Sequence, residues 1–330
     1  MKRMGALVLI ILLIAAMAAG CSANQKQAEK ELPKLTVTLD WTPNTNHTGL
    51  YVAQDQGYYT DSGLKVDIIQ PGEAGALGLV GSGKAQLAVS YQEEVTLARA
   101  QGVPVVAIAA VIQHNTSGFA SPVDRNIKTV ADFAGKRYGG WGGPSEQATL
   151  DLLMKKAGKD PKSISMVNIG TTDFFAAVRR DIDFAWIYAG WTGIEAEQRG
   201  VKLNYIPLKD LDPVFDYYTP VLVANENWLK DNPDLARKFL QATSKGYQYC
   251  SQKPDQAAEI LLKAAPELNP KIVKASQRYL APLYQDDAVR WGEMKAVVWK
   301  RYADWLYQNG ILQKPVDTGK AFTNDYLPSR

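Results

Sequence analysis

The alternation of strand-like and helix-like segments is the feature that most constrains how this 330-residue chain can fold. In two consecutive stretches, short apolar segments alternate with longer segments of helical periodicity. The first stretch predicts strands and intervening helices over the following ranges: strands 35–39, 64–69, 86–89 and 103–112, and helices 49–57, 72–81 and 95–101. Strands that alternate with helices predict an α/β fold with a largely parallel sheet.

The second stretch repeats this pattern after segment 118–122, whose Gly and Pro are expected to interrupt it. Its predicted elements are strands 136–140, 164–169 and 183–188, a helix over 144–157 and a helix capped by Thr172 and Asp173. Segments 84–89 and 181–186 are alike, because each has a helix end, a polar step and then a strand. We therefore expect two similar lobes.

The last third of the chain is predicted to be one strand followed by helices, over 219–224, 233–251, 254–265, 270–280 and 291–309. The last helix carries an aromatic and apolar stripe at helical spacing: Trp291, Met294, Val298, Tyr302 and Trp305. A stripe of this kind is more typical of core packing than of a cofactor site, so we predict that it is buried.

The N-terminus has the features of a secretory signal. Lys2 and Arg3 precede an apolar run over 5–17, which is too short to span a bilayer comfortably and ends in Ala18-Ala19-Gly20-Cys21. This ending resembles a bacterial lipobox, although Ala18 stands where such motifs usually have Leu. We predict a signal peptide over 1–20, lipidation of Cys21, a flexible tether over 21–33 and an extracytoplasmic, membrane-anchored protein. The alternative is an ordinary signal peptide with an incidental cysteine.

Composition narrows the possible functions of the mature chain. Without Lys2 and Arg3 it has 35 basic and 34 acidic residues and no basic patch, so we expect no nucleic-acid partner. Apart from Cys21 the only cysteine is Cys250, and there are two histidines, so we expect neither an internal disulfide nor a metal site. The 8 Trp and 16 Tyr suit a wet cleft that holds a flat ligand.

One glycine-rich segment resembles a phosphate-binding loop. Residues 78–84 match its first seven positions, but Ala85 stands where Ser or Thr would hold magnesium, and a strand follows instead of a helix. We interpret the segment as a helix end with glycine caps.

Two segments of the second stretch end a strand and begin a helix, which is where ligands bind in open α/β sheets. In 139–146, four glycines around Trp141 would let a ligand approach free backbone N–H groups at the start of a helix. In 185–195, Trp186, Tyr188, Trp191 and Glu195 could stack on a heterocycle and accept hydrogen bonds from its amino group. The alternatives are a tight turn with a packed Trp, and buried aromatic residues beside an exposed Glu195.

The segment 39–53 places Asp40, Trp41, Asn44 and His47 at the end of the first strand. The pattern of Trp41, Pro43, His47, Tyr51 and Ala53, continued by 57–59, 63–64, 81–84 and 182–195, resembles the thiamine-pyrimidine (NMT1/THI5-like) family over nearly all of 35–310.

The resemblance implies one of two activities, because the family has two branches. One branch consists of solute-binding lipoproteins of ABC importers that capture formylaminopyrimidine, with relatives that bind riboflavin or other small compounds. The other is a synthase that needs a Schiff-base lysine and a cysteine cluster. The matching segments here, 88–91 and 215–219, contain neither, so the resemblance favours the importer branch.

The importer branch implies a two-lobe periplasmic binding protein of the two-crossover class, with the ligand between the lobes. Lobe 1 would comprise 34–117 and 221–330, and lobe 2 would comprise 118–220. The crossovers near 116–121 and 217–221 would form the hinge. The protein would be a monomeric carrier without enzymatic activity or cofactor, and it would deliver its ligand to a membrane permease.

The resemblance also suggests roles for the candidate residues. Trp41 and either Trp186 or Tyr188 would sandwich the pyrimidine, and Glu195 and Asp40 would hold its amino group and ring nitrogen. Second-tier polar contacts are expected from Asn44, His47 and Tyr91. Trp141 and Trp191, from the two segments described above, are further candidate ligand contacts. One alternative is a binding protein for riboflavin or another heterocycle. The other is an extracytoplasmic enzyme, in which only His47 or His114 could serve as the base.

Overall fold

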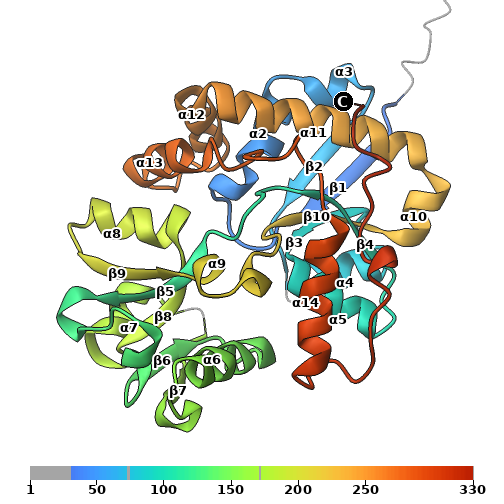
Figure 1. The fold of residues 1–330 in the computed structure, drawn as a ribbon. Coiled ribbons are helices and arrows are strands. Elements are labelled where there is room, and N and C mark those ends of the chain that lie inside the picture. Colours follow the sequence, from blue (N-terminus) through green and yellow to red (C-terminus); the bar gives the residue numbers. More distant parts are fainter. Residues whose placement is uncertain (1–30, 73–74, 171, 330) are drawn as a thin grey trace, which may run out of the picture. The chain divides into compact units, whose positions relative to one another are not determined.

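The computed structural model describes residues 31–72, 75–170 and 172–329. The predicted signal peptide, Cys21 and most of the tether lie outside this part of the chain. Within it, no helix is long and apolar enough to cross a membrane. The unit from Lys34 onward contains two five-stranded sheets, each covered by helices. Figure 1 shows both sheets with their strand labels.

The first sheet has the strand order β2-β1-β3-β10-β4. β1 pairs parallel with β2 and β3, whereas β10 runs antiparallel to β3 and β4. The strands are β1 (Lys34–Thr38), β2 (Lys65–Ile69), β3 (Leu87–Ser90), β4 (Val105–Ala110) and β10 (Val221–Asn225).

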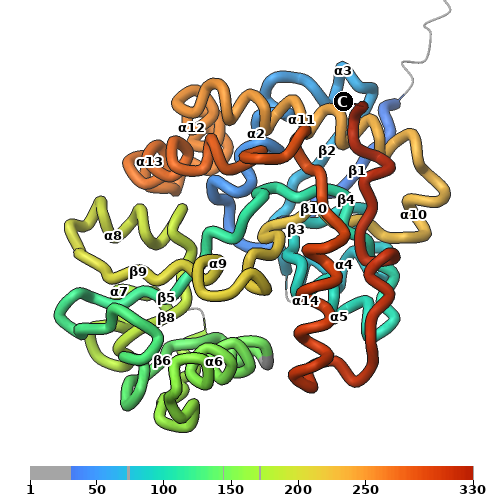
Figure 2. Tube along the Cα trace, in the orientation of Figure 1, coloured from blue at the N-terminus to red at the C-terminus, as the bar shows by residue number. Residues whose placement is uncertain are grey.

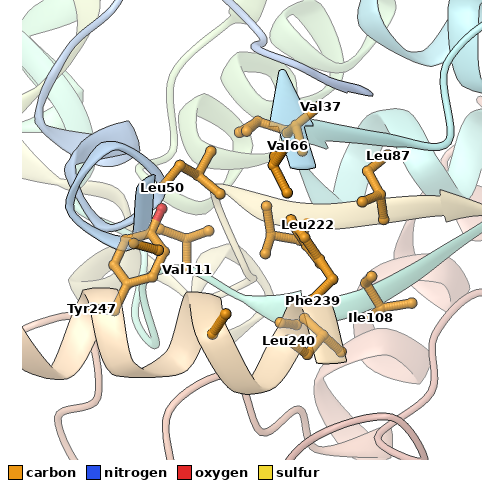
Figure 3. Close-up of a cluster of buried hydrophobic side chains, with 14 of the residues drawn as sticks. Val37, Leu50, Val66, Leu87, Ile108, Val111, Leu222, Phe239, Leu240 and Tyr247 are labelled. Carbon is orange, nitrogen blue, oxygen red and sulfur yellow. The ribbon is translucent and has the colours of Figure 1, made fainter. Parts of the chain in front are cut away.

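Helices cover both faces of the first sheet, because its strands alternate between two buried clusters. Leu87 and Leu222 point to the face that contains Val37, Leu50 and Tyr247 (Figure 3). Ala88, Val221 and Val223 point to the opposite face, and a period of two is expected for a sheet that is buried on both sides. The helices of these segments are α2 (Thr48–Asp55), α3 (Tyr58–Asp61), α4 (Ala76–Gly81), α5 (Gln92–Ala100), α10 (Glu226–Asp231), α11 (Pro233–Gln252), α12 (Pro254–Ala264), α13 (Pro270–Leu280) and α14 (Ala296–Gln308).

The second sheet has the order β7-β6-β8-β5-β9, with β6 parallel to β7 and β8, and β5 antiparallel to β8 and β9. Its strands are β5 (Ser117–Pro122), β6 (Arg137–Gly140), β7 (Ser165–Asn168), β8 (Phe184–Tyr188) and β9 (Leu203–Pro207). The helices are α6 (Pro144–Lys156), α7 (Phe174–Arg180), the π-helix η6 (Ala189–Gly193), α8 (Ile194–Gln198) and α9 (Leu208–Leu211). Within the described residues, the 3₁₀ turns are η2 (Thr45–His47), η3 (Val123–Arg125), η4 (Val130–Phe133), η5 (Pro161–Ser163), η7 (Pro213–Phe215) and η8 (Thr318–Lys320).

One prediction about the second sheet was wrong, and one of its strands was missed. Segment 118–122, expected to interrupt the pattern, lies in β5 between β8 and β9. Gly118 is required there, because a Cβ at this position would lie 2.4 Å from the carbonyl oxygen of Ile206. Strand β9 was not predicted.

The last helix begins at Ala296, later than predicted. Four residues of the predicted stripe, Trp291, Met294, Tyr302 and Trp305, are buried as expected, whereas Val298 is only partly buried. The interpretation of 78–84 is also confirmed. Helix α4 ends at Gly81, and Gly83 has a positive φ of 74° that suits a glycine after a helix end.

The chain passes between the two sheets twice, from β4 to β5 and from η7 to β10 (Figure 2). This confirms the predicted two-crossover fold class. The two crossing segments are hydrogen-bonded to each other, since the backbone N–H of Asn115 donates to Asp216 Oδ1 at 3.0 Å and its side-chain amide donates to the carbonyl of Phe215 at 2.8 Å. The first crossing segment ends before Ser117, earlier than predicted, because 117–121 already belong to β5.

The lobe limits stay a prediction, and helix α14 shows why they are hard to draw. Trp299 of this helix packs with residues of the first sheet. Tyr302 and Trp305 pack instead with Phe215 and Tyr217, in a cluster that includes the core of the second sheet.

Candidate functional site

Three chain segments meet at one edge of the first sheet. β1 and β3 are parallel, so their carboxyl ends carry Asp40 and Tyr91 to the same edge. β10 is antiparallel to β3, with Val221 opposite Ser90, so the residues that precede β10 lie at this edge as well. The contact is close, because the N–H of Gln92 donates to the carbonyl of Tyr218 at 3.0 Å.

The loop after β1 carries Asp40 and Trp41, and hydrogen bonds within this loop fix the position of the Asp40 carboxylate. His47 Nε2 lies 2.6 Å from Asp40 Oδ1, and the N–H of Asn44 donates to His47 Nδ1 at 3.2 Å. Because a backbone N–H can only donate, Nδ1 is the acceptor, and the proton on Nε2 is donated to the carboxylate. His47 and Asn44 are buried and support Asp40, whose side chain stays 22% exposed. Trp41 is 53% exposed.

The segment after β3 adds two carboxyl groups that sequence analysis missed, Glu93 and Glu94. Burial raises the pKa of each, and Asp40 adds to the shift of Glu94. Ser90 Oγ donates to Glu94 Oε2 at 2.5 Å. Burial also raises the pKa of Tyr91, with further contributions from both glutamates and Asp40. The signal was present in the sequence, because both glutamates directly follow a buried strand.

In the glycine-rich loop after β6, the N–H groups of residues 141–143 already have an acceptor, which corrects the expectation that these donors are free for a ligand. The carboxylate of Glu146, in the first turn of α6, accepts hydrogen bonds from the N–H groups of Trp141, Gly142 and Gly143 at 2.7–3.2 Å. The hydroxyl of Tyr138 donates to the same carboxylate at 2.7 Å. The loop is therefore closed by its own helix, and it leaves the Trp141 side chain 47% exposed.

Aromatic side chains line the second sheet beside this loop. The rings of Trp141 and Trp186 lie 5.4 Å apart in an edge-to-face arrangement, and Trp186 contacts Phe119 in the same way at 5.6 Å. Tyr188 is two residues after Trp186 on β8 and therefore lies on the same face. Its surface is 41% exposed, yet burial raises the pKa of its hydroxyl to about 12.

Several interactions connect the aromatic residues of the second sheet to the edge of the first. The Tyr188 hydroxyl is hydrogen-bonded to Thr219, and Tyr188 interacts electrostatically with Tyr91, Glu93 and Asp40. Ser145, next to the glycine loop, donates a hydrogen bond to Glu93. Asp40, Tyr91, Trp186 and Tyr188 are therefore parts of one region, and their contact with a ligand stays a prediction.

Two predicted site residues have other partners. The Glu195 carboxylate forms an ion pair with Arg199 one turn further along α8, and the Arg199 guanidinium lies 4.3 Å from the centre of the Phe175 ring. Trp191 packs against a cluster formed by Ala258, Leu261 and Val273.

Two surface pockets lie elsewhere. One, of about 330 Å³, is lined by residues of 99–102 and 314–320, and the other, of about 320 Å³, by residues of 247–252 and 281–291. Among the described residues, no group of three or more His, Cys, Asp or Glu side chains is arranged to hold a metal ion. Cys250 is buried, and burial raises its thiol pKa well above the ordinary value, so it is unreactive.

The fold is that of the periplasmic binding proteins. The aliphatic sulphonate binding protein SsuA of Escherichia coli matches with a TM-score of 0.69 at 18% identity, over 89% of this chain and 99% of that chain. The NMT1/THI5-like family model matches residues 44–257, and the chain belongs to this family.

The similar proteins include binding proteins for two different ligands and an enzyme. The formylaminopyrimidine-binding protein of Halalkalibacterium halodurans is 28% identical over 96% of this chain and 98% of that protein. The riboflavin-binding protein RibY of Chloroflexus aurantiacus is 28% identical over 97% and 96%. A 4-amino-5-hydroxymethyl-2-methylpyrimidine phosphate synthase of Legionella pneumophila is 24% identical over 89% and 92%.

Proposed function

We propose that this protein is the solute-binding component of an ABC importer and that it captures a flat, amino-substituted heterocycle. One observation carries the proposal: the carboxylate of Asp40 and the rings of Trp186 and Tyr188 belong to one region that draws on both sheets. Carboxylates accept hydrogen bonds from amino groups, and aromatic rings stack on a π face. Trp41, Tyr91 and Trp141 complete the proposed site.

The ligand that we propose is formylaminopyrimidine. An aminopyrimidine offers N–H donors at its edge to Asp40 and a flat face to the tryptophans. The relative from Halalkalibacterium halodurans, similar over nearly its whole length, supports this choice. Riboflavin is the second candidate because RibY is equally similar. Its larger ring system has more face to stack and fewer donors for the carboxylates.

A synthase activity is the alternative from a different class of protein. The segment Ala88–Tyr91 contains no lysine, and His47 is buried with both ring nitrogens engaged. A base whose ring nitrogens already have partners is poorly placed to take a proton from a substrate. We therefore propose a carrier without enzymatic activity.

The carrier role implies a location and a partner. We propose an extracytoplasmic monomer, anchored through lipidated Cys21, that delivers its ligand to a membrane permease. Cys21→Ala should release the protein from membranes without changing ligand affinity. Recovery of unlipidated wild-type protein in the soluble fraction would contradict the anchor.

The experiment that tests the ligand is calorimetric titration with formylaminopyrimidine, thiamine and riboflavin. Only the first should bind tightly, and it should stabilise the protein by about 2.7 kcal/mol at a hundredfold excess over Kd. Tighter binding of riboflavin would overturn the ligand but keep the carrier role. Mass spectrometry of the recovered ligand tests the enzymatic alternative, because a carrier returns it unchanged.

A further inference from the structure

A buried serine on helix α13 bridges loops that come from the two sheets. Ser276 Oγ lies 2.5 Å from the hydroxyl of Thr45, which belongs to the loop that presents Asp40 and Trp41. The Ser276 hydroxyl also donates to the carbonyl of Gly190, in the π-helix directly after Tyr188. Both site-bearing segments are therefore held by one side chain that has no exposed surface.

The direction of these hydrogen bonds follows from the available protons. A carbonyl oxygen can only accept, so the single proton of Ser276 is given to Gly190. The hydroxyl of Thr45 must then donate to Ser276. The result is a chain of two hydrogen bonds in one direction, from Thr45 through Ser276 to Gly190, in which each bond strengthens the other.

The π-helix is seated closely on α13 around this bridge. A Cβ at Gly190 would lie 2.8 Å from the end of the Leu280 side chain and 3.3 Å from the Tyr279 ring. The next residue, Trp191, packs with Leu261 and Val273 of α12 and α13. The absence of a side chain at 190 lets the backbone approach Ser276, and Trp191 holds it there.

A second hydrogen bond holds the loop of Thr45, and it comes from Tyr284, which follows helix α13 in the sequence. The hydroxyl of Tyr284 donates to the Thr45 carbonyl at 2.7 Å. Thr45 is thus held through its backbone and its side chain, and only the side-chain contact continues to Gly190.

We propose that Ser276 is a positioning residue that holds the Asp40 loop and the Tyr188 turn in one arrangement, so that the carboxylate and the aromatic ring meet the ligand already in place. The proposal rests on the proposed function of this site. Ser276 itself touches no ligand in this scheme. Pre-organisation of this kind lowers the entropy cost of binding and slows dissociation.

The first test needs no ligand and uses hydrogen exchange on the mature protein. Ser276→Ala removes the bridge, and Ser244→Ala is the matched control. Ser244 is also a buried helical serine, and within the described residues its hydroxyl has one hydrogen bond, which it accepts from nearby Gln248 at 3.3 Å. Ser276→Ala should speed exchange in both segments 40–50 and 187–198, whereas the control should not. Faster exchange confined to α13, or no change in either segment, would overturn the proposal.

A second variant separates the two ends of the bridge. Thr45→Val keeps the shape and replaces the hydroxyl with a methyl group, so it removes the bond that Thr45 donates and should speed exchange in 40–50 strongly and in 187–198 less. Equal effects on both segments in Ser276→Ala, together with this graded effect, support a relay through Ser276. If Thr45→Val leaves 40–50 unchanged, Thr45 is held by Tyr284 alone and the proposal fails.

The ligand arm measures the rate of formylaminopyrimidine dissociation. Losing the two hydrogen bonds should speed dissociation about three- to tenfold in Ser276→Ala, with a melting temperature close to that of the Ser244→Ala control. Equal dissociation rates in the two variants would overturn the positioning role. If wild-type protein does not bind this ligand, the proposed ligand fails, and the exchange experiment still decides about Ser276.

Discussion

The loops after β1 and β6 both begin at the end of a parallel strand and both contain a carboxylate, but they use it differently. In the β1 loop, Asp40 accepts a hydrogen bond from His47 and keeps part of its surface exposed. In the β6 loop, Glu146 is fully buried and accepts hydrogen bonds from three backbone N–H groups and one hydroxyl. The Asp40 carboxylate keeps exposed surface, whereas the Glu146 carboxylate is fully occupied by hydrogen bonds from its own loop and from Tyr138.

The difference shows how a glycine-rich strand end can be stabilised without a bound anion. The N–H groups at the start of a helix attract negative charge, and the acid at the third helical position supplies it. The β6 loop then exposes a ring, Trp141, whereas the β1 loop exposes both a carboxylate, Asp40, and a ring, Trp41. A ligand that fits both loops therefore needs hydrogen-bond donors at its edge and an aromatic face.

The largest effect is expected from Glu146→Gln, which tests the internal role of this carboxylate. The amide keeps one acceptor oxygen and turns a donor toward backbone N–H groups that remain buried. Unsatisfied buried donors cost about 1–3 kcal/mol each, so we expect a loss of roughly 2–4 kcal/mol in the free energy of unfolding. Urea denaturation measures it. Normal stability with weaker ligand binding would mean that Glu146 is a ligand contact and that the two loops are alike.

Asp40→Asn should weaken ligand binding without a comparable loss of stability. A hydrogen bond to a charged group contributes about 1.5–3 kcal/mol, which corresponds to roughly a tenfold to hundredfold change in Kd. Calorimetry of this variant should be compared with Asp61→Asn, which changes an exposed carboxylate on α3. Unchanged affinity in Asp40→Asn would leave the β1 loop without a demonstrated ligand contact.

Trp141→Ala examines the aromatic contribution of the β6 loop. Losing the ring removes stacking worth roughly 0.5–1.5 kcal/mol and some apolar area, so Kd should rise about five- to tenfold. Tyr307→Ala is the control, because this tyrosine on α14 is similarly exposed. Equal affinities in both variants would mean that the ring of Trp141 does not contact the ligand.

Glu93 extends the comparison to pH, because burial first, and then Glu146 and Glu94, raise its pKa above the unfolded value. The folded protein therefore binds more protons than the unfolded chain above about pH 4.5, and its stability falls as the pH rises through the raised pKa. Glu93→Gln removes this cost and should raise the melting temperature at pH 8. The difference should shrink toward pH 5. A constant difference at both pH values would show that Glu93 does not titrate in this range.

The parts of the fold that sequence analysis predicted are those with apolar periodicity, such as 86–89 and 103–112. Segment 118–122 was missed because Ser, Gly and Pro are typical of turns, and only the neighbouring strands show why a glycine is needed within this one. Packing against strands that are distant in the sequence makes this segment a strand, and the spacing of residues within the segment does not show that packing.

The candidate site was predictable as far as strand ends determine it, which is why Asp40, Tyr91 and Tyr188 lie in one region. The use of each side chain was not predictable. His47 and Asn44 were expected to touch the ligand. Their hydrogen-bonding atoms face the loop, where His47 holds Asp40, and a ligand contact from either residue stays a prediction. Choosing between such roles needs the partner of each polar atom, which depends on the folded chain.

Glu195 shows this limit most clearly, and it carries the smallest expected effect. Its position after Tyr188 predicts a ligand contact, for which Glu195→Gln should weaken binding about tenfold or more, as expected when a charge-assisted hydrogen bond is lost. In the folded protein its carboxylate pairs with Arg199, which in turn lies over Phe175. A partly exposed pair one turn apart on a helix contributes roughly 0.3–0.5 kcal/mol. We therefore expect Glu195→Gln to change the Kd for formylaminopyrimidine by less than about twofold.

Calorimetry of Glu195→Gln beside Arg199→Gln separates the two interpretations. If only the Glu195 variant loses affinity, the carboxylate leaves Arg199 to hold the ligand, and the second sheet then supplies a charge as well as a ring.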